Sequence, residues 1–173
     1  MKGRSIIIAS LLTVLTACGG QAPQRPSQRK SAVPQADTAA LALMEMNQQL
    51  AEAADEQLYR YAQAQPESYA LYEQGTWVHM FDSGDAQRGT IQAGEECTLH
   101  LRISSLNGKL YSDAEQTARA GKYELPAAID ENITEWRHEA QMRLLAPWYA
   151  AYGIKGKGNI PPYENIVIDL EIR

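Results

Sequence analysis

Apolar and polar side chains alternate along two stretches of the chain, residues 95–103 and 166–172. The apolar positions of these stretches are Cys97, Leu99, Leu101 and Ile103, followed by Ile166, Ile168, Leu170 and Ile172. Alternation with a period of two is typical of strands that have one buried and one solvated face. The pattern therefore predicts an antiparallel sheet that faces water on one side.

Weaker signals predict further elements around these two strands. Additional strands are expected at residues 76–80, 109–112 and 142–146. Asn107-Gly108 is a strong hairpin signal between the strand that includes residues 95–103 and the next one. Residues 127–139 are expected to form a short helix, and residues 153–162 form a glycine-rich loop. If the short helix covers the apolar face of the sheet, the fold is α+β.

Residues 37–65 contain no Gly or Pro and are rich in strong helix formers such as Ala, Leu, Met, Glu and Gln. Asp37 or Thr38 can cap the start of this helix, and Pro66 ends it. Apolar side chains recur at spacings of three and four, among them Leu43, Met46, Leu50, Leu58 and Tyr61. Two interpretations stay open. The helix is a spacer (residues 37–66) packed on its own domain, or it pairs two protomers in a homodimer through residues 37–65.

The first seventeen residues have the composition of a bacterial lipoprotein signal sequence. Lys2 and Arg4 precede an apolar run from Ile6 to Leu15, and Leu15-Thr16-Ala17-Cys18 follows directly. The run is too short to span a bilayer, which needs about 20 residues. Cys18 is therefore expected to be the lipidation site, and two or more acyl chains anchor a protein stably to a membrane. An ordinary secretory signal with an incidental cysteine is the alternative.

The residues that follow Cys18 bear on location and partners. Residues 18–36 are rich in Gly, Pro, Gln and Ser, as in flexible tethers. Gly19-Gly20 lacks the Asp often linked to inner-membrane retention, which favours an outer-membrane lipoprotein facing the periplasm. Removal of residues 1–17 takes away two positive charges and changes the formal net charge from −5 to −7. Such an acidic chain is not expected to bind nucleic acid.

The C-terminal part of the chain carries a more specific pattern. Its motifs are Ala151-Tyr152-Gly153, Gly156, Gly158, Ile160-Pro161-Pro162 and a closing strand with Asp169-Leu170-Glu171. The pattern continues upstream with Gly94-Glu95, Asn107-Gly108-Lys109 and Tyr111. In order and spacing these motifs resemble the FKBP-type peptidyl-prolyl cis-trans isomerases, over about residues 70–173. The resemblance implies an antiparallel half-barrel sheet wrapped around a short helix, here preceded by a long N-terminal helix.

The resemblance also implies an aromatic-lined hollow that receives an X-Pro bond, with no cofactor and no metal. Tyr152 matches the family tyrosine whose hydroxyl bonds the ligand carbonyl, and Tyr111 and Trp136 are the further catalytic candidates. The residues expected to contact the substrate are Leu101, Tyr123, Ile133, Ile160 and Ile168.

Some positions depart from the family pattern. Leu101 replaces a strand tyrosine, and Ile168 replaces a phenylalanine of the closing strand. Ser112 stands where the family has an aspartate, and Asp113 comes one residue later, on the opposite face of a regular strand. The segment from Tyr123 to Tyr152 is shorter than in the family, which leaves the alignment of Trp136 open.

Other kinds of site are not favoured. His79, His100 and His138 lack the spacing of metal ligands, and no Gly-x-Ser-x-Gly nucleophile motif occurs. Cys97 is expected to be a small buried apolar side chain. The leading hypothesis is an isomerase for X-Pro bonds of exported polypeptides. The competing hypothesis is a non-catalytic FKBP-like chaperone or peptide-binding module of an envelope complex.

Overall fold

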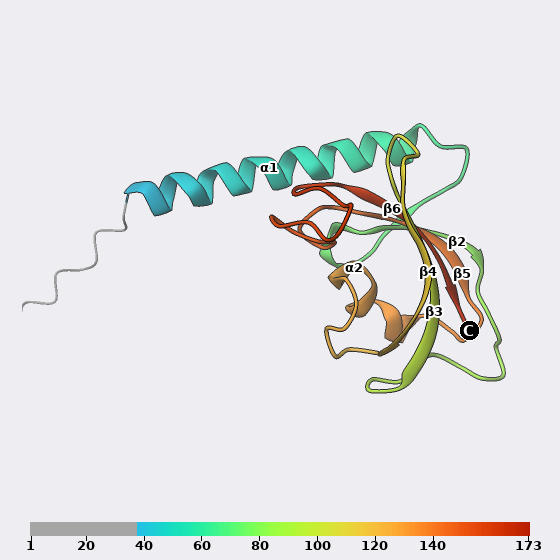
Figure 1. The fold of residues 1–173 in the computed structure, drawn as a ribbon. Coiled ribbons are helices and arrows are strands. Elements are labelled where there is room, and N and C mark those ends of the chain that lie inside the picture. Colours follow the sequence, from blue (N-terminus) through green and yellow to red (C-terminus); the bar gives the residue numbers. More distant parts are fainter. Residues whose placement is uncertain (1–37) are drawn as a thin grey trace, which may run out of the picture. The chain divides into compact units, whose positions relative to one another are not determined.

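The sheet is six-stranded and entirely antiparallel, with the strand order β1-β2-β5-β6-β3-β4. The structure, a computed structural model, describes residues 38–173 (Figure 1). The strands are β1 (Ala70–Leu71), β2 (Trp77–Asp82), β3 (Glu96–Ser105), β4 (Leu110–Arg119), β5 (Gln141–Ala146) and β6 (Ile166–Ile172). The expected signal sequence (1–17), Cys18 and the expected tether (18–36) lie outside the described residues. Within the described part, no helix has both the length and the apolar character needed to cross a membrane.

The inner face of the sheet follows the alternation of the sequence. In β3 and β6, Leu101 lies opposite Leu170 and Ile103 lies opposite Ile168, and all four side chains are buried. Figure 1 shows the sheet curved around α2 (Ala127–Asp130), whose Ile129 is part of the same core. This arrangement confirms the predicted α+β half-barrel around a short helix.

The outer face is not wholly solvated, in contrast to the simple expectation. The second half of α1 (Thr38–Gln63) packs on it, where Leu58 and Ala62 meet Leu145 of β5 and Val167 of β6. Leu145 and Val167 occupy the positions that alternation assigns to water, yet their exposed fractions are 0% and 6%. Their apolar character is explained by the helix above them, since burial of apolar area is the main favourable term in such docking.

The short helical segment is broken into two pieces. Instead of one helix over residues 127–139, α2 is followed by a 3-10 turn, η2 (Ile133–Glu135). Between them, the buried Asn132 donates from its side-chain amide to the carbonyl of Ala128 and accepts a hydrogen bond from the backbone N–H of Glu73. An asparagine that bonds backbone groups in this way competes with helix continuation.

β4 extends well beyond the expected strand at residues 109–112. It is an edge strand and is mostly exposed, so its sequence lacks the apolar alternation that identifies β3 and β6. Asp113 of β4 faces outward, where its carboxylate meets His100 Nε2 at 2.8 Å and Arg102 Nη1 at 3.2 Å. The expected placement of Asp113 on the face opposite to Ser112 is therefore correct.

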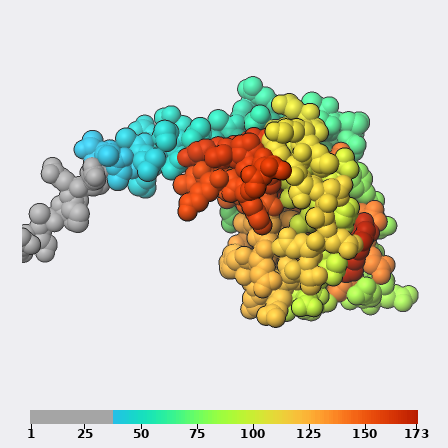
Figure 2. Space-filling view, viewed as in Figure 1, coloured from blue at the N-terminus to red at the C-terminus, as the bar shows by residue number. Residues whose placement is uncertain are grey.

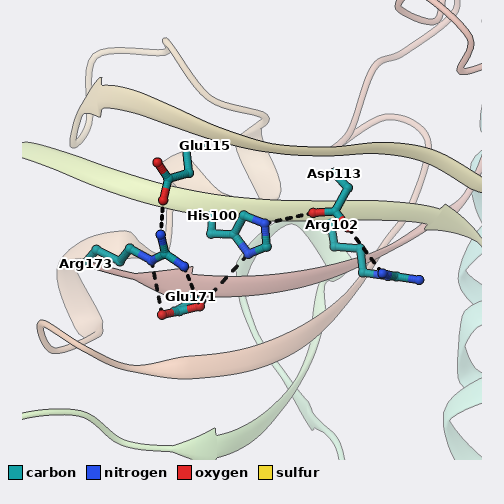
Figure 3. A network of polar contacts seen from close by, with 6 residues as sticks. All are labelled: His100, Arg102, Asp113, Glu115, Glu171 and Arg173. Carbon is teal, nitrogen blue, oxygen red and sulfur yellow. Dashed lines mark hydrogen bonds and ion pairs between the residues drawn. The ribbon is translucent and has the colours of Figure 1, made fainter.

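Figure 3 shows that outward polar side chains of β3, β4 and β6, together with Arg173 directly after β6, form a connected network. Its members are His100, Arg102, Asp113, Glu115, Glu171 and Arg173. Arg173 bonds Glu171 at 3.1 Å and also contacts Glu115. Exposed ion pairs contribute at most about 1 kcal/mol each, so the network adds little to the stability of the fold.

Candidate active site

The loop between β5 and β6 folds back on itself and carries the residues of the Ala-Tyr-Gly and Ile-Pro-Pro motifs. The backbone N–H of Gly153 donates to Trp148 O at 2.7 Å, and that of Tyr163 donates to Gly153 O at 3.1 Å. At the tip, Lys157 and Ile160 exchange two backbone hydrogen bonds of 3.1 and 3.0 Å. Figure 2 shows this loop between α1 and the β3–β4 hairpin.

Gly156 is required for this loop conformation. Its φ of +66° lies in the left-handed region, and a Cβ at this position would lie 2.2 Å from the carbonyl oxygen of Ile160. Any side chain would therefore both strain the backbone and push the two arms of the loop apart. The glycine therefore allows the backbone of Ile160 and Pro161 to approach it closely.

A cavity of about 320 Å³ lies between this loop and the inner side of β3 and β4. It is lined by Leu101, Ile103, Tyr111, Ser112, Ala114, Glu115, Gln116, Tyr152, Lys157, Gly158, Asn159 and Ile160. We call this cavity the hollow. Leu101, Ile103 and Ile160 form its buried apolar part, and most of its polar side chains come from β4 and the loop tip. Cavities of this size and character take a small apolar group with a few oriented polar contacts.

Tyr152 has the chemistry of a hydrogen-bond donor inside the hollow. Desolvation by burial raises the pKa of its phenol, so the hydroxyl keeps its proton at neutral pH. Within residues 38–173 no protein group is hydrogen-bonded to that hydroxyl, which is therefore available to a ligand carbonyl. The ammonium group of Lys157 lies 5.5 Å from the centre of the Tyr152 ring, on its face.

Tyr111 contributes its ring rather than its hydroxyl. The hydroxyl donates to Glu164 Oε1 at 2.7 Å, and burial together with this carboxylate raises the pKa of the phenol. The side chain is half-buried and is held at the edge of the hollow, because its polar end is already bonded. Four of the residues proposed from the sequence (Leu101, Tyr111, Tyr152 and Ile160) are thus brought together around one cavity.

The other four proposed residues do not line the hollow. Ile133 and Ile168 are fully buried in the core, and Trp136 is 2% exposed. The Trp136 ring packs 6.4 Å from that of Tyr72, and its indole N–H has no partner in the described protein. The short 3-10 turn η2 ends at Glu135 and directs Trp136 into the core, so it does not form an accessible floor.

Tyr123 lies on a tight turn outside the hollow. It is 76% exposed and has a φ of +56°, and its backbone N–H donates to the buried carboxylate of Asp130 at 2.9 Å. The turn thus exposes the ring to solvent instead of adding it to a wall. The prediction that Tyr123 forms a wall was based on its position in the sequence, which does not indicate the left-handed backbone conformation of this turn.

Sequence reasoning also missed residues that the hollow contains. Ala114 and Gln116 follow Ser112 at a spacing of two along β4, so all three line the hollow, but the expected strand ended at residue 112. Ile103 belongs to the alternating face of β3 and could have been chosen with Leu101. Lys157 is exposed at the loop tip, and only the folded loop places its ammonium group over the ring of Tyr152.

The hollow offers apolar walls that exclude water and a hydrogen-bond donor, the hydroxyl of Tyr152. The described residues contain no group of His, Cys, Asp and Glu side chains placed to hold a metal ion. Cys97, the second cysteine of the chain, is buried in the core, and burial raises the pKa of its thiol. The arrangement is suited to a reaction that needs a change of environment around an amide.

No protein-family model matches the sequence, and no curated protein matches it. Solved structures do match the fold. The chain is similar to a peptidyl-prolyl cis-trans isomerase from Pseudomonas syringae pv. tomato, with 20% identity, a TM-score of 0.58, and coverage of 70% of this chain and 92% of that one. It is also similar to AtFKBP13, with 21% identity, a TM-score of 0.55, and coverage of 60% and 95%.

A third similar structure is FkpA from Escherichia coli, with 20% identity and a TM-score of 0.59. The match covers 78% of this chain but only 63% of FkpA. The domain that follows α1 therefore has the FKBP fold, as the sequence motifs predicted, and it is a divergent example of that fold.

Proposed function

We propose that the chain is an FKBP-type peptidyl-prolyl cis-trans isomerase that acts on X-Pro bonds of exported proteins. The observation that carries the proposal is the position of Tyr152. Its protonated hydroxyl has no hydrogen-bond partner within residues 38–173, and its side chain lines one hollow with the apolar side chains of Leu101 and Ile160. The fold of the similar isomerase structures supports the same reaction.

The hollow has the features that this reaction needs. Rotation about a peptide bond breaks its conjugation and costs about 18–20 kcal/mol, so X-Pro bonds isomerise in tens to hundreds of seconds. Apolar walls replace the water that stabilises the planar, polar imide. A hydrogen bond from Tyr152 to the carbonyl of the twisted imide then favours the transition state over the ground state. No proton transfer or covalent intermediate is involved.

The test is the cis-trans exchange rate of proline peptides, measured by NMR with and without the full chain. Tyr152→Phe keeps the ring and removes the donor, so the catalysed rate is expected to fall by up to about tenfold, the value of one hydrogen bond. Tyr59→Phe, which removes an exposed hydroxyl on α1, is the matched control. Exchange rates equal to those of the free peptides would overturn the proposal.

A second candidate function, a non-catalytic chaperone or peptide-binding module, is favoured by the position of Trp136. With this side chain in the core, the hollow has no exposed indole against which a proline ring could lie. In addition, Ser112 stands at the position where the family has an aspartate. The nearby Asp113 does not replace that aspartate, because it bonds His100 and Arg102 on the outer face of the sheet. Peptide binding without any change in exchange rate would select this function.

We further propose that Cys18 is acylated and anchors the protein to the outer membrane, facing the periplasm. The sequence Leu15-Thr16-Ala17-Cys18 after an apolar run supports this proposal. Mass spectrometry of the N-terminal peptide from membrane fractions tests it. Acyl chains on Cys18 are expected, and a free thiol on a chain that still begins at Met1 would contradict the proposal.

We also propose that α1 pairs with α1 of a second copy. Leu43, Met46 and Leu50 share one face of the helix by their spacing, and their exposed fractions are 53%, 47% and 37%. These side chains lie beyond the half of α1 that packs on the sheet. Analytical ultracentrifugation of Leu43→Lys against the unchanged chain tests the proposal, which fails if the unchanged chain is monomeric at high concentration.

A further inference from the structure

One charged side chain at the hollow, Lys157, forms no ion pair within residues 38–173. Of the described residues that line the hollow, Glu115 and Lys157 carry formal charges. Glu115 contacts the guanidinium of Arg173 in the outer network, so its charge is compensated (Figure 3). Lys157 contacts the ring of Tyr152, and no carboxylate within residues 38–173 forms an ion pair with it.

The loop geometry holds Lys157 at the hollow. The paired backbone bonds between Lys157 and Ile160 fix the lysine backbone beside the Ile160 wall. Gly156, where a Cβ would overlap the Ile160 carbonyl, makes this close approach possible. The ammonium group is thereby placed over the ring whose hydroxyl is the proposed donor to the substrate carbonyl. Lys155 of the same loop is exposed like Lys157, but it does not line the hollow.

The remaining nearby acid is also engaged. Glu164 accepts the hydrogen bond of Tyr111 at 2.7 Å, so its carboxylate is directed to the edge of β4 and not to Lys157. A ligand that enters the hollow therefore meets apolar walls, neutral polar groups such as Gln116 and Asn159, and the Glu115 carboxylate, which is paired with Arg173. It also meets the ammonium group of Lys157, which forms no ion pair within residues 38–173. These features are complementary to a peptide in which an apolar proline ring lies next to an acidic side chain.

We propose that the hollow selects X-Pro segments in which an acidic residue flanks the proline, and that Lys157 is the residue that determines this specificity. This inference rests on the proposed function, because it uses the same hollow and the same bound carbonyl. When the proline ring lies among Leu101 and Ile160 and its carbonyl meets Tyr152, the adjacent side chains of the peptide lie at the rim with Lys157. A carboxylate there is attracted to the ammonium group, whereas a lysine is repelled.

The preference for acidic flanking residues is expected to be modest, because Lys157 is exposed. Exposed ion pairs change affinities by about two- to fivefold. The preference is also expected to weaken when salt is raised from low to high concentration, since screening acts strongly on exposed charges.

The experiment uses the full chain and peptides that differ only beside the proline, with Glu, Gln or Lys placed before it or after it. Exchange rates and peptide affinities are both measured by NMR. Glu peptides are expected to exceed their Gln counterparts by about two- to fivefold and Lys peptides to fall below them. Lys157→Gln is expected to bring the Glu-to-Gln ratio close to one, Lys157→Arg to retain it, and the matched control Lys155→Gln to leave it unchanged.

The outcomes separate this inference from the isomerase proposal. Turnover of all peptides without a preference for Glu overturns the inference alone, as does a preference that survives in Lys157→Gln. A Glu preference in binding without any acceleration overturns the isomerase proposal and keeps the inference. Failure to bind or turn over any peptide of the series overturns both.

Discussion

The phenol of Tyr149 donates a 2.5 Å hydrogen bond to the Asp55 carboxylate of α1. Tyr149 lies three residues before Tyr152, so this bond ties the loop that forms the hollow to the long helix. Two further bonds join the same parts, from the indole N–H of Trp148 to Leu50 O at 3.4 Å and from the Asn165 amide to Gln57 at 2.7 Å. The helix is therefore a structural support of the loop as well as a connection to the N-terminal residues.

Removal of the Tyr149 hydroxyl is expected to loosen this support. Tyr149→Phe deletes a bond to a charged acceptor, and because both groups are partly exposed the free energy of unfolding should fall by only about 1 kcal/mol. Urea denaturation measures it, with Tyr59→Phe as the control. An unchanged midpoint for Tyr149→Phe would show that this hydrogen bond adds nothing measurable to the other contacts between the helix and the loop.

The same bond predicts a loss of stability in alkali. Burial and the Asp55 carboxylate raise the pKa of Tyr149 above its ordinary value of 10.0, so the folded state favours the protonated phenol. The contribution of this raised pKa to the free energy of unfolding is complete below pH 10. It is lost as the pH rises above 10, because Tyr149 releases its proton at lower pH in the unfolded chain than in the folded one. The difference in urea midpoint between the unchanged chain and Tyr149→Phe is expected to be smaller at about pH 11 than at pH 8, with the decrease beginning near pH 10. A difference that stays constant over that range would contradict the assignment.

Gly156→Ala is expected to disrupt the hollow. The new Cβ would overlap the carbonyl of Ile160, so the loop must open, and peptide affinity should fall more than tenfold together with the thermal midpoint. Gly153→Ala is the matched control. Gly153 has the same φ of +66°, but no atom lies within 4 Å of an added Cβ. Gly153→Ala should therefore lower the free energy of unfolding only by the backbone strain, about 1–2 kcal/mol. Equal effects of the two changes would show that close packing at Gly156 is unimportant.

The two halves of α1 are expected to respond differently to the same substitution. Leu58→Ala removes a side chain that is fully buried against the sheet and should destabilise the domain by about 2–5 kcal/mol. Leu43→Ala, in the exposed half, should change the free energy of unfolding by less than about 0.5 kcal/mol. Denaturant titration at low protein concentration measures both. A large loss in Leu43→Ala under these conditions would mean that the exposed half of α1 is packed.

Much of the fold follows from local signals in the sequence. The alternation in β3 and β6 predicted which side chains enter the core, since a period of two is a property of the strand itself. The start and end of α1 follow from its composition and from Pro66. The resemblance of the Ala-Tyr-Gly and Ile-Pro-Pro motifs to those of the FKBP-type isomerases suggested Tyr152 and Ile160, and both side chains line the hollow.

The tertiary structure decided what depends on contacts between distant segments. Val167 looks like one more residue of a solvated face, and only the docking of α1 explains its burial. Trp136 and Tyr123 are aromatic residues near the expected positions, yet a 3-10 turn buries the first and a left-handed backbone exposes the second. Lys157 becomes part of the hollow because the loop folds onto itself. Sequence periodicity reports which face of an element is apolar, whereas the partner of that face and the direction of a loop side chain depend on packing across the whole domain.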